Sequence, residues 1–150
     1  MGQSLAKLYV HLVFSTKERH PFLDNALRDE LHAYIGGICA DLESPCRAIQ
    51  SVSDHVHLLF TLNKNLALAQ AVMQIKKGSS KWLHGKHPRF QHFARQAGYG
   101  AFSVGESNVE TVCRYIAEQE KHHRKMNFQD ELRAFLERYH IAFDERYIWD

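Results

Sequence analysis

The chain has 150 residues, of which 45% are hydrophobic and 24% are charged, and its formal net charge is +2. A chain of this length fits one domain with a core of its own, and its composition is typical of a soluble globular protein. No apolar run is long enough to span a bilayer, so we expect no membrane partner. The three cysteines are odd in number and form no C-x-x-C pair, which favours reduced thiols in a cytoplasmic protein over a disulfide framework or a zinc site.

The hydrophobic pattern predicts eight elements in chain order. Residues 8–15 alternate as a strand, and a turn near Pro21 precedes apolar residues at helical spacing from Leu27 to Leu42. Two further strands are expected over residues 47–53 and 55–62, followed by a helix over 66–83 and a short strand over 101–104. The spacing then predicts one helix over 109–124 and a last helix that Asn127 opens as its cap.

This order predicts an α+β fold of the split βαβ type, ferredoxin-like or RRM-like, in a single domain over residues 1–150. Its four-stranded antiparallel sheet would carry helices on one face, with the additional helices at the C-terminal end of the chain. We expect the other face of the sheet to be free.

The segment DHVHLLF, residues 54–60, places two histidines on that free face. Because side chains alternate along a strand, His55 and His57 point one way while Val56, Leu58 and Phe60 point the other. Two imidazoles on one face can bind a divalent metal. An isolated pair of histidines is also compatible with a surface role or a satisfied place in the core.

The helix expected over residues 109–124 carries a second candidate group. Tyr115 and Gln119 are four residues apart and share a face with His122, beside the apolar stripe that contains Val112 and Ile116. An amide oxygen can complete a metal site with two histidines, and a phenol beside it can attack a phosphate. A tyrosine at the boundary of an apolar stripe can also serve packing alone.

Basic residues dominate the middle of the chain, because no acidic residue lies between Asp54 and Glu106. Such a one-sided segment favours a polyanionic partner such as nucleic acid, although a solvated basic face is the alternative. The candidates for DNA phosphate contacts lie on the helix over 66–83, in the loop after it, and after the first strand; they are Lys77, Lys81, Arg89, Arg95, Lys17 and Arg19.

The segments DHVHLLF, RYIAEQEKHHRK and NFQDELRAFLERYHI, together with the ending DERYIWD, resemble the HUH single-tyrosine transposases of small bacterial and archaeal insertion sequences, the IS200-like group. The likeness covers nearly the whole chain. The joint motif, His-hydrophobic-His followed about 60 residues later by Tyr-x-x-x-Gln, is more specific than either part.

The resemblance implies a transposase that cleaves and rejoins single-stranded DNA at hairpin-bearing ends of a mobile element. Carried onto matching positions, it makes His55, His57 and Gln119 the ligands of Mg²⁺ or Mn²⁺ and Tyr115 the nucleophile that forms a 5′-phosphotyrosine. Asp54 matches an acidic residue that can orient an imidazole of the pair. The family also implies a homodimer that shares its active sites between subunits, associated with the nucleoid in the cytoplasm.

Two other functions fit the same residues. One is a related HUH nickase of plasmid or phage replication, and the other is a non-catalytic regulator that binds single-stranded DNA or RNA on the same sheet. Tyr115 distinguishes them, because a binding module has no use for a nucleophile. The sequence identifies no group that removes the proton of the phenol, the pKa of which is ordinarily near 10.

Overall fold

The computed structural model describes residues 2–15, 25–86 and 98–149. Its centre is a four-stranded sheet in the order β2-β3-β1-β4, in which every neighbouring pair is antiparallel. The strands are β1 (Tyr9–Ser15), β2 (Cys46–Val52), β3 (His55–Thr61) and β4 (Gly100–Val104). The split βαβ topology is confirmed, and β3 lies in the interior of the sheet between β1 and β2.

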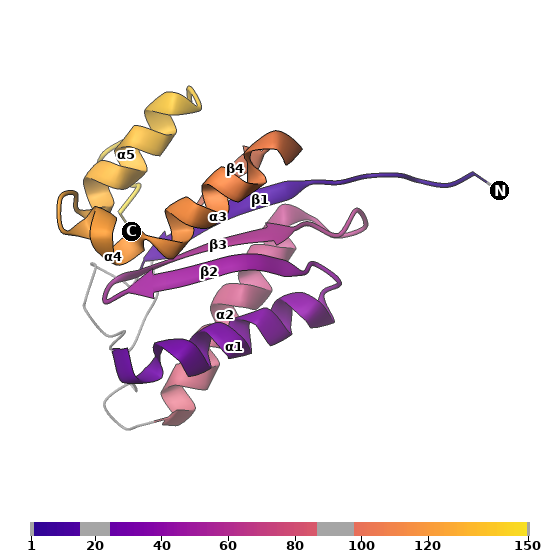
Figure 1. The fold of residues 1–150 in the computed structure, drawn as a ribbon, viewed down its shortest axis with the longest axis horizontal. Coiled ribbons are helices and arrows are strands. Elements are labelled where there is room, and N and C mark those ends of the chain that lie inside the picture. The colour runs from indigo at the N-terminus through magenta and orange to yellow at the C-terminus, as the bar shows by residue number, and fades with distance from the viewer. Residues whose placement is uncertain (1, 16–24, 87–97, 150) are drawn as a thin grey trace.

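Helices cover the sheet on both faces (Figure 1). The first pair is α1 (Asn25–Asp41) and α2 (Leu68–Lys86), which pack side by side on one face. On the other face lie α3 (Val109–Ala117), α4 (Gln119–His123) and α5 (Phe128–Arg138), with the short 3₁₀ turn η3 (Glu106–Asn108) before α3. None of the described helices is long and apolar enough to cross a membrane.

The face under α1 and α2 is an apolar core. Alternate residues of β3 point into it, and Val56, Leu58 and Phe60 are each at most 2% exposed. Leu31 and Ile35 from α1 and Val72 and Ile75 from α2 close over these side chains at helical spacing. This layer holds the sheet and the first two helices together through burial of apolar surface.

The prediction that the second face is free was wrong. Tyr9, Val13 and Leu59 point to this face and are nearly inaccessible, because α3, α4 and α5 lie over them. The physical reason is visible in the strands, since apolar side chains accompany the histidines on this face and would otherwise be exposed to water. The histidine pair is therefore buried beneath the C-terminal helices instead of open on a surface.

The expected helix over 109–124 is two helices, which is a second correction. It breaks at Glu118, whose φ of −98° and ψ of 23° depart from helical values, so that α3 ends at Ala117 and α4 begins at Gln119. The expected cap of the last helix is confirmed, because the Asn127 side chain accepts a hydrogen bond from the Asp130 backbone N–H at 2.8 Å.

Candidate active site

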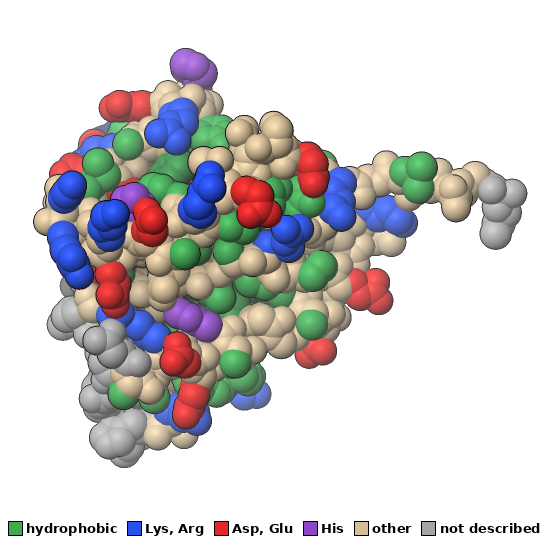
Figure 2. Space-filling model, in the orientation of Figure 1, with side chains coloured by type: hydrophobic (Ala, Val, Ile, Leu, Met, Phe, Trp, Pro, Cys, Tyr) green, Lys and Arg blue, Asp and Glu red, His purple; other side chains and the backbone are tan. Residues whose placement is uncertain are grey.

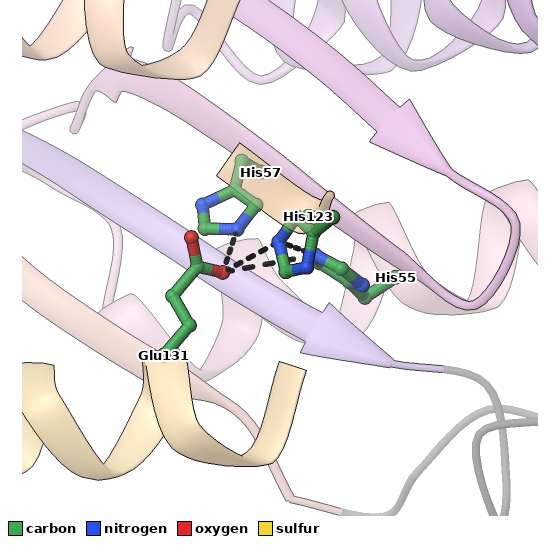
Figure 3. A group of neighbouring side chains, drawn as sticks. All are labelled: His55, His57, His123 and Glu131. Carbon is green, nitrogen blue, oxygen red and sulfur yellow. Dashed lines mark hydrogen bonds and ion pairs between the residues drawn. The ribbon is translucent and has the colours of Figure 1, made fainter. Parts of the chain in front are cut away.

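The two histidines of β3 point the same way, into the layer between the sheet and α5. His55 and His57 are 1% and 0% exposed, and their ring centroids are 5.3 Å apart. Figure 3 shows that the Nε2 atoms of both rings are directed toward a carboxylate on α5, that of Glu131. Glu131 Oε1 lies 2.7 Å from His57 Nε2 and 3.7 Å from His55 Nε2.

His123, at the end of α4, completes this group. Its Nε2 lies 2.9 Å from His55 Nε2 and 3.2 Å from Glu131 Oε1. The four candidate ligand atoms of His55, His57, His123 and Glu131 all lie within 4.8 Å of one another. Strand β3 and the two later helices α4 and α5 therefore converge on one point.

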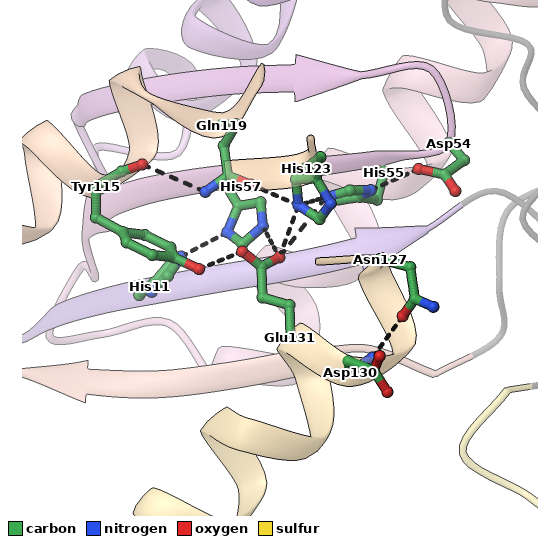
Figure 4. Close-up of polar contacts among 10 residues, drawn as sticks. All are labelled: His11, Asp54, His55, His57, Tyr115, Gln119, His123, Asn127, Asp130 and Glu131. Atoms are coloured by element: carbon green, nitrogen blue, oxygen red, sulfur yellow. Dashed lines mark hydrogen bonds and ion pairs between the residues drawn. The ribbon is translucent and has the colours of Figure 1, made fainter. Parts of the chain in front are cut away.

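Each histidine of β3 also has a partner for its second ring nitrogen. His55 Nδ1 donates to Asp54 Oδ1 at 2.6 Å, and His57 Nδ1 lies 2.9 Å from Nε2 of His11 on β1 (Figure 4). Ligand histidines in metalloproteins are commonly held by such a contact, which fixes the ring and the tautomer. A proton on His55 Nδ1 leaves the lone pair of its Nε2 directed into the cluster.

The side chains of Tyr115 and Gln119 also reach this histidine and carboxylate cluster. The Tyr115 hydroxyl donates to Glu131 Oε2, so that one carboxylate touches both the phenol and the histidines (Figure 4). Gln119 is fully buried, and its Oε1 accepts a hydrogen bond from His123 Nε2 at 3.0 Å while its Nε2 donates to the Tyr115 carbonyl at 3.3 Å.

Burial sets the electrostatics of the cluster. Desolvation lowers the pKa of His57 to about 4, because the hydrogen bond to Glu131 only partly offsets the cost of a buried charge. Burial alone would raise the pKa of Glu131, but hydrogen bonds from His123, His57 and Tyr115 hold it well below its usual range. At neutral pH an ionised carboxylate thus faces a neutral imidazole of His57, which is the protonation state that binds metal.

The same environment suppresses ionisation of the nucleophile candidate. Burial, and then the hydrogen bond and charge of Glu131, raise the pKa of the Tyr115 phenol above its ordinary value of 10, while Gln119 and Arg138 act in the opposite direction. A positive charge that approaches the phenol would lower this pKa. The site as it stands holds the phenol protonated.

The donor set fits a divalent metal ion. Three acceptors, His55 Nε2, Gln119 Oε1 and Glu131 Oε1, converge on His123 Nε2, which carries at most one proton. The buried acceptor atoms here outnumber the protons available to them, and a bound cation would satisfy the remaining lone pairs. Imidazole nitrogens with carboxylate or amide oxygens suit Mn²⁺ and other transition ions better than Mg²⁺.

A pocket of about 290 Å³ opens beside the Tyr115 ring, on the side of α5. Its lining includes Lys125, Phe135 and Arg138, together with His122, which stacks on the Tyr115 ring at a centroid distance of 4.5 Å. The phenol is thus accessible from one side, although it is not on the open surface.

The basic residues expected to contact DNA are not gathered at this site. Lys77 and Lys81 are exposed on α2, the helix layer on the opposite face of the sheet. Lys17, Arg19, Arg89 and Arg95 lie outside the described residues. Figure 2 instead shows Lys and Arg side chains around α4 and the turn after it, where Lys121, Arg124 and Lys125 are exposed.

Sequence reasoning missed His123 and Glu131. A signal for Glu131 was present, because it lies three residues after Phe128 and one before Leu132, within the apolar stripe of α5. A carboxylate in such a stripe is unusual unless it has a partner. His123 follows Gln119 by four residues, so both lie on one face of α4.

Comparison with known proteins identifies a family and two similar folds. Residues 4–119 match the family described as "Transposase IS200 like". A crystal structure from Deinococcus radiodurans R1, provisionally described as a transposase, has a TM-score of 0.63 at 24% identity and covers 79% of this chain and 96% of its own. A REP-associated tyrosine transposase bound to a REP hairpin has a TM-score of 0.61 at 15% identity, over 82% of this chain and 73% of its own. Among curated protein sequences, none matches the chain.

Proposed function

This chain belongs to the IS200-like transposase family, and from that premise we propose that it cleaves and rejoins single-stranded DNA through Tyr115. The observation that supports this proposal is the contact of the Tyr115 hydroxyl with Glu131, which itself contacts His57. A nucleophile, a candidate metal site and a buried carboxylate therefore lie within a few hydrogen bonds of one another. A module that only binds nucleic acid has no need of this arrangement.

The reaction follows from the residues present. The Tyr115 hydroxyl gives up its proton as its oxygen attacks the scissile phosphorus. The bond from oxygen to phosphorus forms as the bond from phosphorus to the 3′ oxygen breaks, and the departing 3′ oxygen takes up a proton and leaves as a hydroxyl. The 5′ end stays joined to Tyr115 as a phosphotyrosine. A 3′-hydroxyl that attacks this ester rejoins a strand, without any need for a nucleotide cofactor.

We propose that His55, His57 and Gln119 hold a divalent ion, Mg²⁺ or Mn²⁺, with Asp54 orienting His55. Such an ion supplies charge neutralisation at the non-bridging phosphate oxygens. Asp54 keeps the His55 lone pair directed into the site, and Gln119 presents its amide oxygen there while its amide nitrogen is tied to the backbone of α3.

The substrate would enter beside α5. Lys125 and Arg138 line the pocket next to Tyr115 and can accept the phosphates that flank the scissile bond, and Lys121 and Arg124 extend this positive surface along α4. Hairpin DNA as the partner is supported by the REP hairpin bound to the structurally similar transposase. Lys77, Lys81, Lys17, Arg19, Arg89 and Arg95 stay candidates for contacts with DNA outside the active site.

A homodimer with shared active sites also stays a prediction. In the described chain Tyr115 reaches the histidine cluster of its own chain, so one subunit brings together all the residues of the proposed reaction. An exchange of tyrosine-bearing helices between two subunits would reproduce the same contacts across an interface.

The test is capture of the covalent intermediate. The protein is incubated with a labelled hairpin oligonucleotide and Mn²⁺, and a band that survives denaturing electrophoresis is the expected phosphotyrosine adduct. Tyr115→Phe should abolish the band while hairpin binding in a mobility-shift assay is retained. Tyr147→Phe, at an exposed tyrosine near the C-terminal end, is the matched control and should leave the band unchanged.

The outcomes separate the competing functions. Hairpin binding without any adduct in the unaltered protein would favour the non-catalytic regulator. An adduct that is hydrolysed or transferred only with a replication-origin hairpin would favour the nickase.

A further inference from the structure

We infer that Glu131 is a catalytic residue of this site, which binds the metal ion through Oε1 and holds the Tyr115 hydroxyl through Oε2. The inference rests on the proposed function, because it assigns a role in the same reaction. It adds a carboxylate from α5 to a site for which the family motif provides only the histidine pair, Tyr115 and Gln119.

The first observation is that the two oxygens of Glu131 have different partners. Oε1 lies 2.7 Å from His57 Nε2 and 3.2 Å from His123 Nε2, whereas Oε2 accepts the hydrogen bond from Tyr115. Each partner belongs to a different element, namely β3, α4 and α3. The carboxylate thus contacts both the phenol and the histidine cluster, one through each oxygen.

The second observation is the cost of placing a carboxylate there. Glu131 is 2% exposed and lies in an apolar stripe of α5 whose neighbours, Phe128 and Leu132, pack against the sheet. Burial of an ionised carboxylate is unfavourable unless the charge is compensated, and hydrophobic residues of similar size often serve stability as well or better. Hydrogen bonds from His57, His123 and Tyr115 stabilise this charge within the cluster, and a cation bound there would pair with it directly.

The third observation is that α5 fixes this side chain firmly. Asn127 caps the first turn, and Phe128 lies against the cluster with its ring centroid 4.7 Å from that of His55. The backbone of Glu131 is thus held in the first turn of a capped helix whose apolar face is buried. A ligand must be positioned in this way if it is to bind metal and orient a nucleophile at once.

The charge of Glu131 has a consequence for the choice of metal. A site made only of imidazole and amide ligands has no negative charge, and it would retain a divalent ion weakly. One carboxylate increases the attraction while leaving the ion a net positive charge with which to polarise a phosphate. A mixed set of imidazoles, an amide oxygen and a carboxylate should favour Mn²⁺ over Mg²⁺.

The test measures metal binding separately from DNA cleavage. Glu131→Gln keeps the shape of the side chain and removes its charge, and it should weaken Mn²⁺ binding at least tenfold in titration calorimetry and abolish the covalent adduct. Glu137→Gln, at an exposed position on the same helix, is the matched control and should leave both unchanged. Circular dichroism checks that each variant is folded.

Unchanged Mn²⁺ affinity in folded Glu131→Gln would overturn the inference. If that variant does not fold, Glu131→Asp withdraws the oxygens by one methylene and should weaken Mn²⁺ binding in the same way. Anomalous diffraction from crystals of the unaltered protein soaked in Mn²⁺ needs no variant. Glu131 Oε1 bonded to the ion supports the inference, and a carboxylate turned away from it overturns it.

These measurements keep the inference distinguishable from the proposed function. If the unaltered protein binds Mn²⁺ through Glu131 but never forms an adduct with DNA, the proposed reaction is wrong while the metal role of Glu131 stands. If the adduct forms equally well in Glu131→Gln, the reaction stands and the role of Glu131 is wrong.

Discussion

The two faces of the sheet are both buried, yet they are built from different chemistry. On the face under α1 and α2, β3 contributes Val56, Leu58 and Phe60, and the layer that they enter is mainly apolar. On the face under α3, α4 and α5, the same strand contributes His55 and His57, whose partners are polar groups from the covering helices. A single strand of alternating side chains thus serves a structural core on one side and a reactive site on the other.

The difference shows where stability and function are separated in this molecule. Burial of apolar surface stabilises the first face, whereas the second holds imidazoles whose charged forms burial disfavours. A sequence selected for stability alone would fill both faces with apolar residues. The polar second face therefore indicates that its chemistry is needed for function.

The largest effect is expected from a substitution that creates a cavity on the apolar face. Leu58→Ala should reduce the free energy of unfolding by about 2–5 kcal/mol, because Leu58 is fully buried and the cavity cannot close completely. Mn²⁺ affinity of the folded variant should not change, since Leu58 points away from the cluster. Urea unfolding and calorimetric titration measure the two quantities. A large loss of Mn²⁺ affinity would show that the two faces are not independent.

The second test lowers the pH, which should destabilise the protein through the buried histidines of the second face. In metal-free protein the pKa of His57 is about 4, below the ordinary value of 6.5, so the unfolded chain binds this proton more readily than the folded chain. The contribution of the neutral, buried His57 ring to the free energy of unfolding is fully present above pH 6.5 and is lost as the pH falls toward 4. At about 1.4 kcal/mol per pKa unit, the loss is on the order of 3 kcal/mol.

This pH dependence is tested with one variant at a buried histidine and one at an exposed histidine. His57→Gln should reduce the dependence of stability on pH between 7 and 4.5, as measured by urea unfolding at a series of pH values, while His11, whose pKa burial lowers to about 3, retains part of it. His140→Asn changes an exposed histidine whose φ of 55° asparagine tolerates well, and it should leave the dependence intact. Equal stability of the unaltered protein at pH 7 and 4.5 would contradict the buried, neutral state of His57.

The smallest expected effect is at the cap of α5, the helix that carries Glu131. Asn127→Ala removes a side-chain acceptor from the first turn and should destabilise the protein by about 1 kcal/mol. Asn108 occupies the corresponding position before α3 without a side-chain hydrogen bond to its helix, so Asn108→Ala should cost much less. Thermal unfolding compares the two variants, and equal losses would mean that the Asn127 bond adds nothing.

Much of the fold could be predicted because its strands and helices follow from the local spacing of apolar residues. The alternation of residues 55–62 and the helical spacing around Ile35 and Val72 each depend on neighbours in sequence. The Asn127 cap is equally local, and all these elements appear in the structure close to their expected positions. The family motif also directed attention to His55, His57, Tyr115 and Gln119, which the structure brings together.

The missing parts of the site depend on tertiary contacts. Glu131 lies 74 residues after His57 in sequence, and nothing local indicates that α5 folds back over the sheet. The break at Glu118 is also not evident in the spacing, because the apolar stripe of α3 continues in phase toward Gln119. The apolar side chains of the strands indicate that the second face is covered, but which helices cover it depends on these same long-range contacts.

The pairing of β1 with β3 has a consequence for how the chain reaches its native arrangement. Leu12 lies opposite Leu58 and Val13 opposite His57, so a slip of β3 by one residue would exchange its two sets of side chains between the faces. Both imidazoles would then enter the apolar core under α1 without hydrogen-bond partners, while Gln119 and Glu131 would face only apolar side chains. The residues proposed to do chemistry thus also penalise a sheet in which β3 is displaced by an odd number of residues, and an apolar replacement of the histidines should yield a protein that misfolds more often.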